Sequence, residues 1–105
     1  MSMIFFDTEL IEEVRKDRGL NRAKLSLMLT EKKKDRPPRA NFIRELIANG
    51  GMCQCLENAS LLVNWYGSLE CVKHCDERAK TVLSDMLEEH QEEQRYIAER
   101  EFNCY

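Results

Sequence analysis

Four cysteines and one histidine that could bind a metal ion lie in the second half of the chain, in the segments MCQCLE and ECVKHCDE. Four thiolates, or three thiolates and an imidazole, complete the tetrahedral shell that Zn²⁺ prefers. The CxC and CxxxC spacings differ from the CxxC spacing of zinc knuckles, and small buried thiols are common on apolar helix faces. We therefore expect structural cysteines and no cofactor, with a zinc site as the alternative. The residues concerned are Cys53, Cys55, Cys71, His74 and Cys75.

The carboxylates and the second histidine are not arranged as in an enzyme active site. Glu12–Glu13 and Glu88–Glu89 are neighbours on expected helices, so the two carboxylates of each pair point in different directions and cannot act on one bond. The sequence contains neither a GxSxG motif nor a phosphate-binding glycine loop. His90 lies in an acidic stretch, which is typical of a solvated side chain. We predict that the protein is not an enzyme.

Positive charge is concentrated in one third of the chain. Residues 15–44 contain eleven basic and three acidic residues, whereas residues 51–105 contain five basic and eleven acidic residues, within a chain of net charge −3. Clustered lysines and arginines are what phosphate contacts require, whatever the net charge. A solvated basic loop is the alternative. The residues that we expect to contact nucleic acid are Asn21, Arg22, Lys24, Lys32, Lys33, Lys34, Arg36 and Arg39.

Length and composition indicate one helix-rich domain covering residues 1–105. With 43% apolar and 33% charged residues, the chain can form a modest core, and dimerisation would add to the buried surface. No run of 18 apolar residues is present, so we expect no membrane span. The acidic N-terminus is unlike a secretory signal, which indicates a cytoplasmic protein with reduced cysteines.

The first third of the chain predicts a strand followed by two helices. Residues 2–6 are apolar and rich in Ile and Phe, which favours a short strand. Asp7 or Thr8 can cap a helix over residues 8–18, and Gly19 can end it. Asn21 caps a second helix whose apolar residues are Leu25, Leu27, Met28 and Leu29.

The rest of the chain predicts three more helices, which makes the fold mainly α, with five helices and a short N-terminal strand. The third helix starts at Pro37–Pro38 and stops at residues 49–51, and the fourth covers residues 53–66. The fifth is long and acidic, over residues 69–100, and its apolar stripe is lost between Leu87 and Ile97. This end should be an exposed extension able to pack on a partner. The predicted parts are a strand-helix-helix unit (1–35), a helical hairpin (36–68) and the C-terminal helix (69–105).

The segment MIFFDTELIEEVRKDRGLNRAKLSLML resembles a ribbon-helix-helix unit, with a strand, a helix, a turn of the form xGLxR and a second helix. The segment NFIRELIANGGMCQCLENASLLVNW, with the CDERAKTVLSDMLEE stretch beyond it, is similar to plasmid relaxosome accessory proteins of the MobC/NikA type. The resemblance implies a dimer whose paired strands enter the major groove of DNA. It also implies that the protein belongs to a mobile genetic element. It also implies that the second helix holds a phosphate at its N-terminus.

The expected strand departs from that family in one respect, because residues 2–6 include no Arg, Lys, Asn or Gln to distinguish base edges. The part of the resemblance that these residues still support is a phosphate contact near Leu20, Asn21 and Arg22. A conventional helix-turn-helix is the rival fold, although its turn has three or four residues and the break between Glu31 and Pro38 is longer.

We therefore predict a dimeric accessory or regulatory protein that binds duplex DNA through residues 15–44. The alternative belongs to a different class. It is a small helical regulator or inhibitor that binds another protein through the acidic C-terminal helix.

Overall fold

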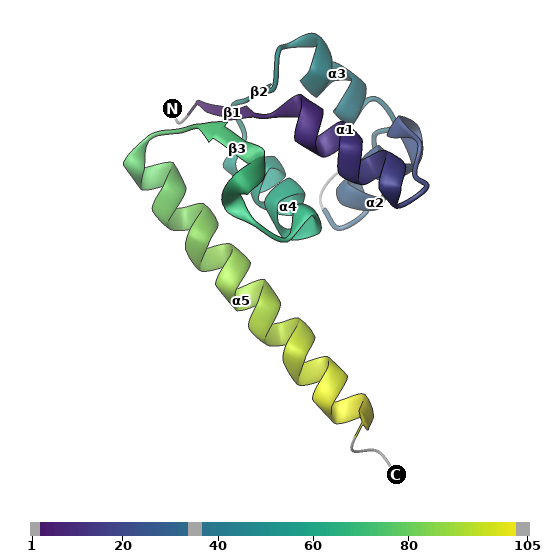
Figure 1. Cartoon of the computed structure of the whole chain (residues 1–105), viewed down its shortest axis with the longest axis vertical. Coiled ribbons are helices and arrows are strands. Elements are labelled where there is room, and N and C mark those ends of the chain that lie inside the picture. The colour runs from purple at the N-terminus through teal and green to yellow at the C-terminus, as the bar shows by residue number, and fades with distance from the viewer. Residues whose placement is uncertain (1–2, 34–36, 103–105) are drawn as a thin grey trace.

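The computed structural model describes residues 3–33 and 37–102, with side chains up to Arg100. The described part is mainly helical, as predicted, and the predicted N-terminal strand is present (Figure 1). Lys34 and Arg36 of the predicted contact set lie outside the described residues. The elements follow in the order β1 (Ile4–Phe6), α1 (Thr8–Asp17), α2 (Arg22–Thr30), α3 (Phe42–Ala48), β2 (Met52–Cys53), α4 (Leu56–Tyr66), a 3₁₀ turn (Leu69–Cys71), β3 (Val72–His74) and α5 (Glu77–Phe102).

The strand β1 is the middle strand of a small antiparallel sheet with the order β2-β1-β3. Ile4 and Phe6 point into the core and are at most 1% exposed, whereas Phe5 lies on the other face beside His74. Both edges of β1 therefore pair within the same chain. This differs from the ribbon between two protomers that the resemblance implied, because β1 has no free edge for a second copy.

Helix boundaries in the first third of the chain follow the predicted caps. Asp7 precedes α1 and its carboxylate accepts hydrogen bonds from the backbone N–H groups of Glu9 and Leu10. Asn21 caps α2, and its side-chain oxygen accepts a hydrogen bond from the backbone N–H of Lys24 at 2.7 Å. Local side-chain chemistry is sufficient to set these two starts.

Three predicted boundaries are wrong, and long-range pairing explains two of them. The fourth helix begins at Leu56 and not at residue 53, because Met52–Cys53 pairs with β1. The fifth helix begins at Glu77 and not at residue 69, because Val72–His74 forms β3. The third helix begins at Phe42 and not at Pro37–Pro38. The chain before it is held against α2, because the Arg39 N–H donates a hydrogen bond to Thr30 Oγ1 at 2.8 Å.

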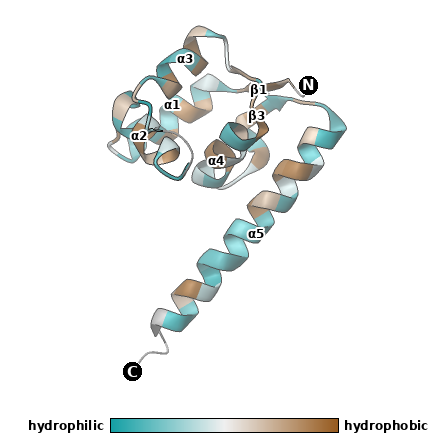
Figure 2. Cartoon of the chain, turned by 180° about the vertical axis from the view of Figure 1, so that it is seen from behind, coloured by the Kyte–Doolittle hydropathy of each residue, from teal (hydrophilic) through white to brown (hydrophobic). Residues whose placement is uncertain are grey.

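The core lies between the sheet, the four shorter helices and the first half of α5. Ala79 and Leu83 are buried where α5 packs on α4. Beyond this contact α5 extends away from the globule, and its outer half is hydrophilic along most of its length (Figures 1 and 2). The predicted exposed extension is confirmed, since every residue from Gln91 to Arg100 is exposed. The largest fully buried side chains are Ile4, Phe6, Ile11, Leu25, Leu29, Ile43, Leu62 and Leu83.

Candidate nucleic-acid interface

The basic third of the chain is organised by the packing of α2 on α3. Leu25 and Leu29 of α2 and Ile43 and Leu46 of α3 are all buried in the common core. The connection between the helices runs from Glu31 to Asn41, which is eleven residues. It is longer than the three- or four-residue turn of a conventional helix-turn-helix, although the two helices are packed together in the same order.

Two hydroxyl side chains of α2 lock this helix pair. The Ser26 Oγ accepts a hydrogen bond from the Ile43 N–H at 2.9 Å and donates to the Arg22 carbonyl at 2.7 Å. The Thr30 Oγ1 accepts from the Arg39 N–H and donates to the Ser26 carbonyl at 2.8 Å. Both residues are buried, so these bonds hold the start of α3 and the chain before it at fixed positions relative to α2. The sequence analysis missed this role, although two hydroxyl residues four apart within an apolar helix are a signal for it.

Several arginines of the basic region are already bound to groups of the protein itself. Glu12 of α1 forms ion pairs with both Arg15 and Arg22. In the pair with Arg22, the distance between Arg22 Nη2 and Glu12 Oε1 is 2.5 Å. Arg39 pairs with Glu45 at 2.6 Å. Of the predicted contact residues, Arg22 and Arg39 are therefore partly neutralised.

The clamp formed by Glu12, Arg15 and Arg22 joins the half-buried Glu12 and Arg15 to the exposed Arg22, and it changes the acidity of its carboxyl group. Burial alone would raise the pKa of Glu12, but the hydrogen bonds and charges of Arg15 and Arg22 together lower it below the usual 4.5. Glu12 therefore stays ionised at neutral pH and joins α1 to the start of α2. The role of Arg22 in the structure is to close this clamp.

The arginine that directly follows α1 is bound to an aromatic ring. Arg18 Nη1 donates to the Trp65 carbonyl at 2.9 Å, and its guanidinium lies 4.7 Å from the centre of the Trp65 ring. This cation–π contact joins the end of α1 to α4. Trp65 thus serves a contact inside the globule.

Several cations that form no ion pair with the described residues lie on α2, on its following connection and on α3, and others lie on α1, β3 and α5. Lys24, Lys32 and Arg44 are exposed, and Lys33 is half-buried. Of these, Lys24, Lys32 and Lys33 belong to the predicted contact set. Asn21 takes part as the cap of α2, so its side-chain oxygen satisfies one of the N–H groups that was expected to meet a phosphate.

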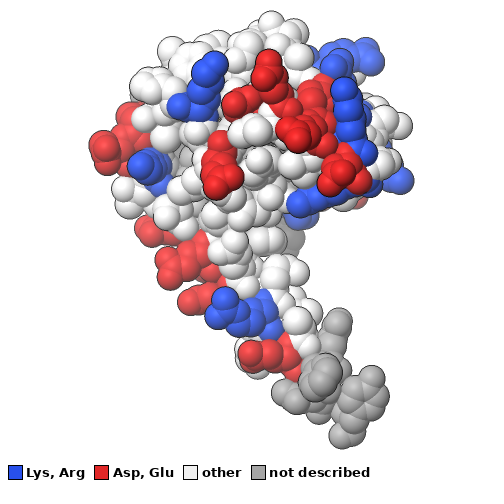
Figure 3. Space-filling view, viewed as in Figure 1, with Lys and Arg blue, Asp and Glu red and all other residues white. Residues whose placement is uncertain are grey.

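The distribution of charge over the molecule separates this region from its surroundings. Figure 3 shows acidic side chains gathered over α1, in the upper part of that face, and basic side chains along the edge toward α2. Acidic side chains also predominate on the projecting α5, where residues 77–102 contain eight acidic and four basic residues. An anion approaching this face is therefore favoured at the α2 edge over the acidic surface of α1.

The cysteines that could have formed a zinc site are not grouped. In residues 3–33 and 37–100, no three His, Cys, Asp or Glu side chains lie together as metal ligands. Burial raises the pKa of Cys71 to about 12, and burial also raises the pKa values of Cys53 and Cys75. These thiols are protonated at neutral pH, whereas a metal binds the thiolate. Cys55 is exposed.

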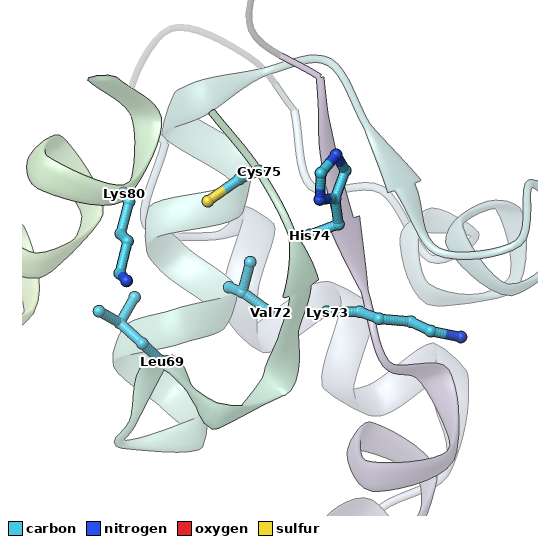
Figure 4. A pocket seen from close by; sticks show the side chains of 6 residues that line it. All are labelled: Leu69, Val72, Lys73, His74, Cys75 and Lys80. Carbon is cyan, nitrogen blue, oxygen red and sulfur yellow. The ribbon is translucent and has the colours of Figure 1, made fainter. Parts of the chain in front are cut away.

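A cavity of about 210 Å³ lies between β3 and the start of α5. Its lining consists of Leu69, Val72, Lys73, His74, Cys75 and Lys80 (Figure 4). The polar groups of this lining are the Cys75 thiol, the His74 imidazole and the ammonium groups of Lys73 and Lys80, beside the apolar side chains of Leu69 and Val72.

The described helices include none that is both long and apolar enough to cross a membrane. Comparisons of the chain with protein-family models, with curated protein sequences and with solved structures gave no match.

Proposed function

We propose that this chain binds duplex nucleic acid without catalysing a reaction, as a cytoplasmic accessory or regulatory protein. The observation that supports the proposal is a group of cations on the α2–α3 unit that form no ion pair with any other residue that the structure describes. It comprises Lys24, Lys32, Lys33 and Arg44.

The packing of α2 on α3 supports a duplex as the target. A rigid pair of helices can place one helix against a groove while its neighbours contact the phosphate backbone. The buried bonds of Ser26 and Thr30 supply that rigidity. Because β1 lies inside the sheet with Ile4 and Phe6 in the core, the proposed contact does not involve this strand.

The free cations also predict the strength of binding and its response to salt. Each phosphate neutralised by a lysine or arginine releases counter-ions, with a slope of about −0.9 in log K against log salt. Four such contacts give a slope of about −3.6. Binding should therefore be easy to detect at low salt and weak at physiological salt.

The test is fluorescence anisotropy with a labelled duplex of mixed sequence over a series of salt concentrations. Reversing three free cations in the variant Lys24→Glu/Lys32→Glu/Arg44→Glu should weaken binding strongly and reduce the slope by about three. The matched control, Lys73→Glu/Arg78→Glu/Lys80→Glu, changes the net charge equally at exposed positions away from the α2–α3 unit. It should retain most of the wild-type affinity.

Two results would contradict the proposal. The first is wild-type protein that does not bind the duplex at low salt. The second is an equal loss in the two triple variants, because net charge alone would then explain the binding.

A second candidate function is the regulation of another protein through α5. It is favoured by the exposure of the outer half of this helix, where Tyr96 is 66% exposed. A protein partner that co-purifies stoichiometrically after nuclease treatment and in high salt, and that is lost when the chain ends at Gln91, would favour this candidate.

A further inference from the structure

The outer part of α5, residues 92–100, is a helical surface without a partner among the described residues. The Gln91 side chain donates to the Gly67 carbonyl at 3.2 Å, and every later described side chain is exposed. Tyr96 and Ile97 are 66% and 43% exposed. An isolated helical end of this length gains little from its own hydrogen bonds, so a contact that covers its apolar residues would stabilise it.

The charges of this helix also favour an external cation. Glu88 and Glu92 are four residues apart on the helix, and so are Glu89 and Glu93. Like charges at this spacing repel each other. A positively charged surface beside the outer part of α5 would relieve this repulsion.

The exposed face of α2 supplies a cation next to apolar side chains. Its residues Leu27 and Met28 are 37% and 40% exposed, although they lie on a helix whose other face is in the core. Lys24 lies one turn before Met28, and Glu31, still in helical conformation, lies one turn after it. The face thus presents a base, an apolar side chain and an acid at intervals of four and three residues.

The outer part of α5 presents the opposite order at the same intervals. Glu93, Ile97 and Arg100 are also spaced by four and three residues, and all three are exposed. This face therefore presents an acid, an apolar side chain and a base. Helices with such patterns complement each other when they lie side by side and run in the same direction.

We propose that the outer part of α5 in one copy of the chain binds the exposed face of α2 in a second copy, with the two helices parallel. Two copies related by a two-fold axis then exchange this contact reciprocally and form a closed dimer. The facing pairs are Glu93 with Lys24, Ile97 with Met28 and Arg100 with Glu31.

A second copy fits this contact better than the same chain does. Within one chain α5 packs on α4, and its outer half runs away from the globule that carries α2 (Figures 1 and 2). Bringing the two faces together within one molecule would require α5 to break. In the dimer the helix stays straight.

The dimer would also regulate the proposed function. Lys24 lies in the contact, so self-association would cover part of the cationic surface and compete with the duplex. This consequence depends on the proposed function, whereas the dimer itself does not.

The experiment is sedimentation velocity on the full chain without nucleic acid, using two charge-swapped variants. The first, Glu93→Lys/Arg100→Glu, reverses the α5 pattern, and the second, Lys24→Glu/Glu31→Lys, reverses the α2 pattern. We expect wild type to form a dimer and each variant alone to be mainly monomeric, because each has like charges facing each other in both contacts. A mixture of the two variants should form a heterodimer, because every facing pair is then again opposite in charge.

The quadruple variant that combines both swaps should recover the wild-type dimer, and circular dichroism should show equal helix content in all chains. A wild type that stays monomeric at every accessible concentration would overturn the proposal. So would an α2 variant that dimerises as well as wild type, since α5 would then be covered by another surface. Because the samples contain no nucleic acid, these outcomes are independent of the duplex-binding test.

Discussion

The globule formed by residues 4–74 and the outer half of α5 are ordered by different forces. In the globule, each element is fixed by contacts with residues far away in the sequence, such as the hydrogen bond from the Phe6 N–H to the Gly51 carbonyl at 2.8 Å. In α5, the residues beyond Gln91 are exposed, so the helix there depends on local hydrogen bonds and on the helix propensity of its residues. Single substitutions should therefore have large effects in the first region and small effects in the second.

The largest effect should come from Gly51→Ala in the turn before β2. Gly51 has a φ of +90°, and an added Cβ would lie 2.2 Å from the Phe6 carbonyl oxygen. The turn and the β1–β2 pairing cannot both persist, so we expect the free energy of unfolding to fall by about 3 kcal/mol or more. Urea denaturation followed by circular dichroism measures this change.

The neighbouring residue provides the matched control. Gly50 also has a positive φ, of +67°, but an added Cβ would meet nothing within 4 Å. Gly50→Ala should therefore lower stability by only about 1 kcal/mol, the cost of the left-handed conformation. Equal losses in the two variants would show that the close approach of Gly51 to β1 is not what fixes the turn.

The difference between these glycines also shows where prediction from sequence stops. The Asn49–Gly51 stretch predicted the end of a helix, and α3 does end at Ala48. The contact of Gly51 with Phe6 could not be predicted, because it joins residues 45 positions apart. For the same reason β2 and β3 were missed, since strands of two and three residues are defined by their pairing with β1 more than by their own composition.

A smaller effect should follow from Glu12→Gln, which removes the charge that holds Arg15 and Arg22. Glu12 is 15% exposed, and charged hydrogen bonds of this kind contribute about 1.5–3 kcal/mol. We expect a loss of about 2 kcal/mol at pH 7. At low protein concentration, the same substitution at the exposed Glu93 of α5 should change stability by less than about 0.5 kcal/mol.

The effect of Glu12→Gln should depend on pH in a defined direction. Because the pKa of Glu12 is lowered in the folded state, its stabilising contribution is present above the usual value of 4.5 and is lost as the pH falls through the lowered value. Wild type and Glu12→Gln should therefore converge in stability in acid. A difference that stays constant down to low pH would show that the charge of Glu12 is not responsible.

The candidate site was only partly predictable, and Glu12 explains why. The sequence identifies the basic region, and Lys24, Lys32 and Lys33 are indeed free of ion pairs in the described part of the chain. It does not reveal that Arg22 is bound, since Glu12 lies ten residues away on a different helix. Clusters of charge in a sequence therefore overestimate the charge available at the surface, because folding pairs some of the cations with distant acids.

The smallest effect should come from ending the chain at Gln91, which removes the outer part of α5. At low protein concentration the free energy of unfolding should change by less than about 0.5 kcal/mol, because the described side chains in the removed part, residues 92–100, are all exposed. The helical signal in circular dichroism should fall, and in the full chain the amides of residues 92–100 should exchange hydrogen fastest among the helices.

The dependence of stability on protein concentration tests the same truncation further. If α5 is covered only when two copies meet, the full chain should become more stable as the concentration rises, whereas the shortened chain should not. A shortened chain that is destabilised by more than about 1 kcal/mol even at low concentration would contradict the comparison. The outer half of α5 would then have to contribute to the fold of a single chain, as the globule does.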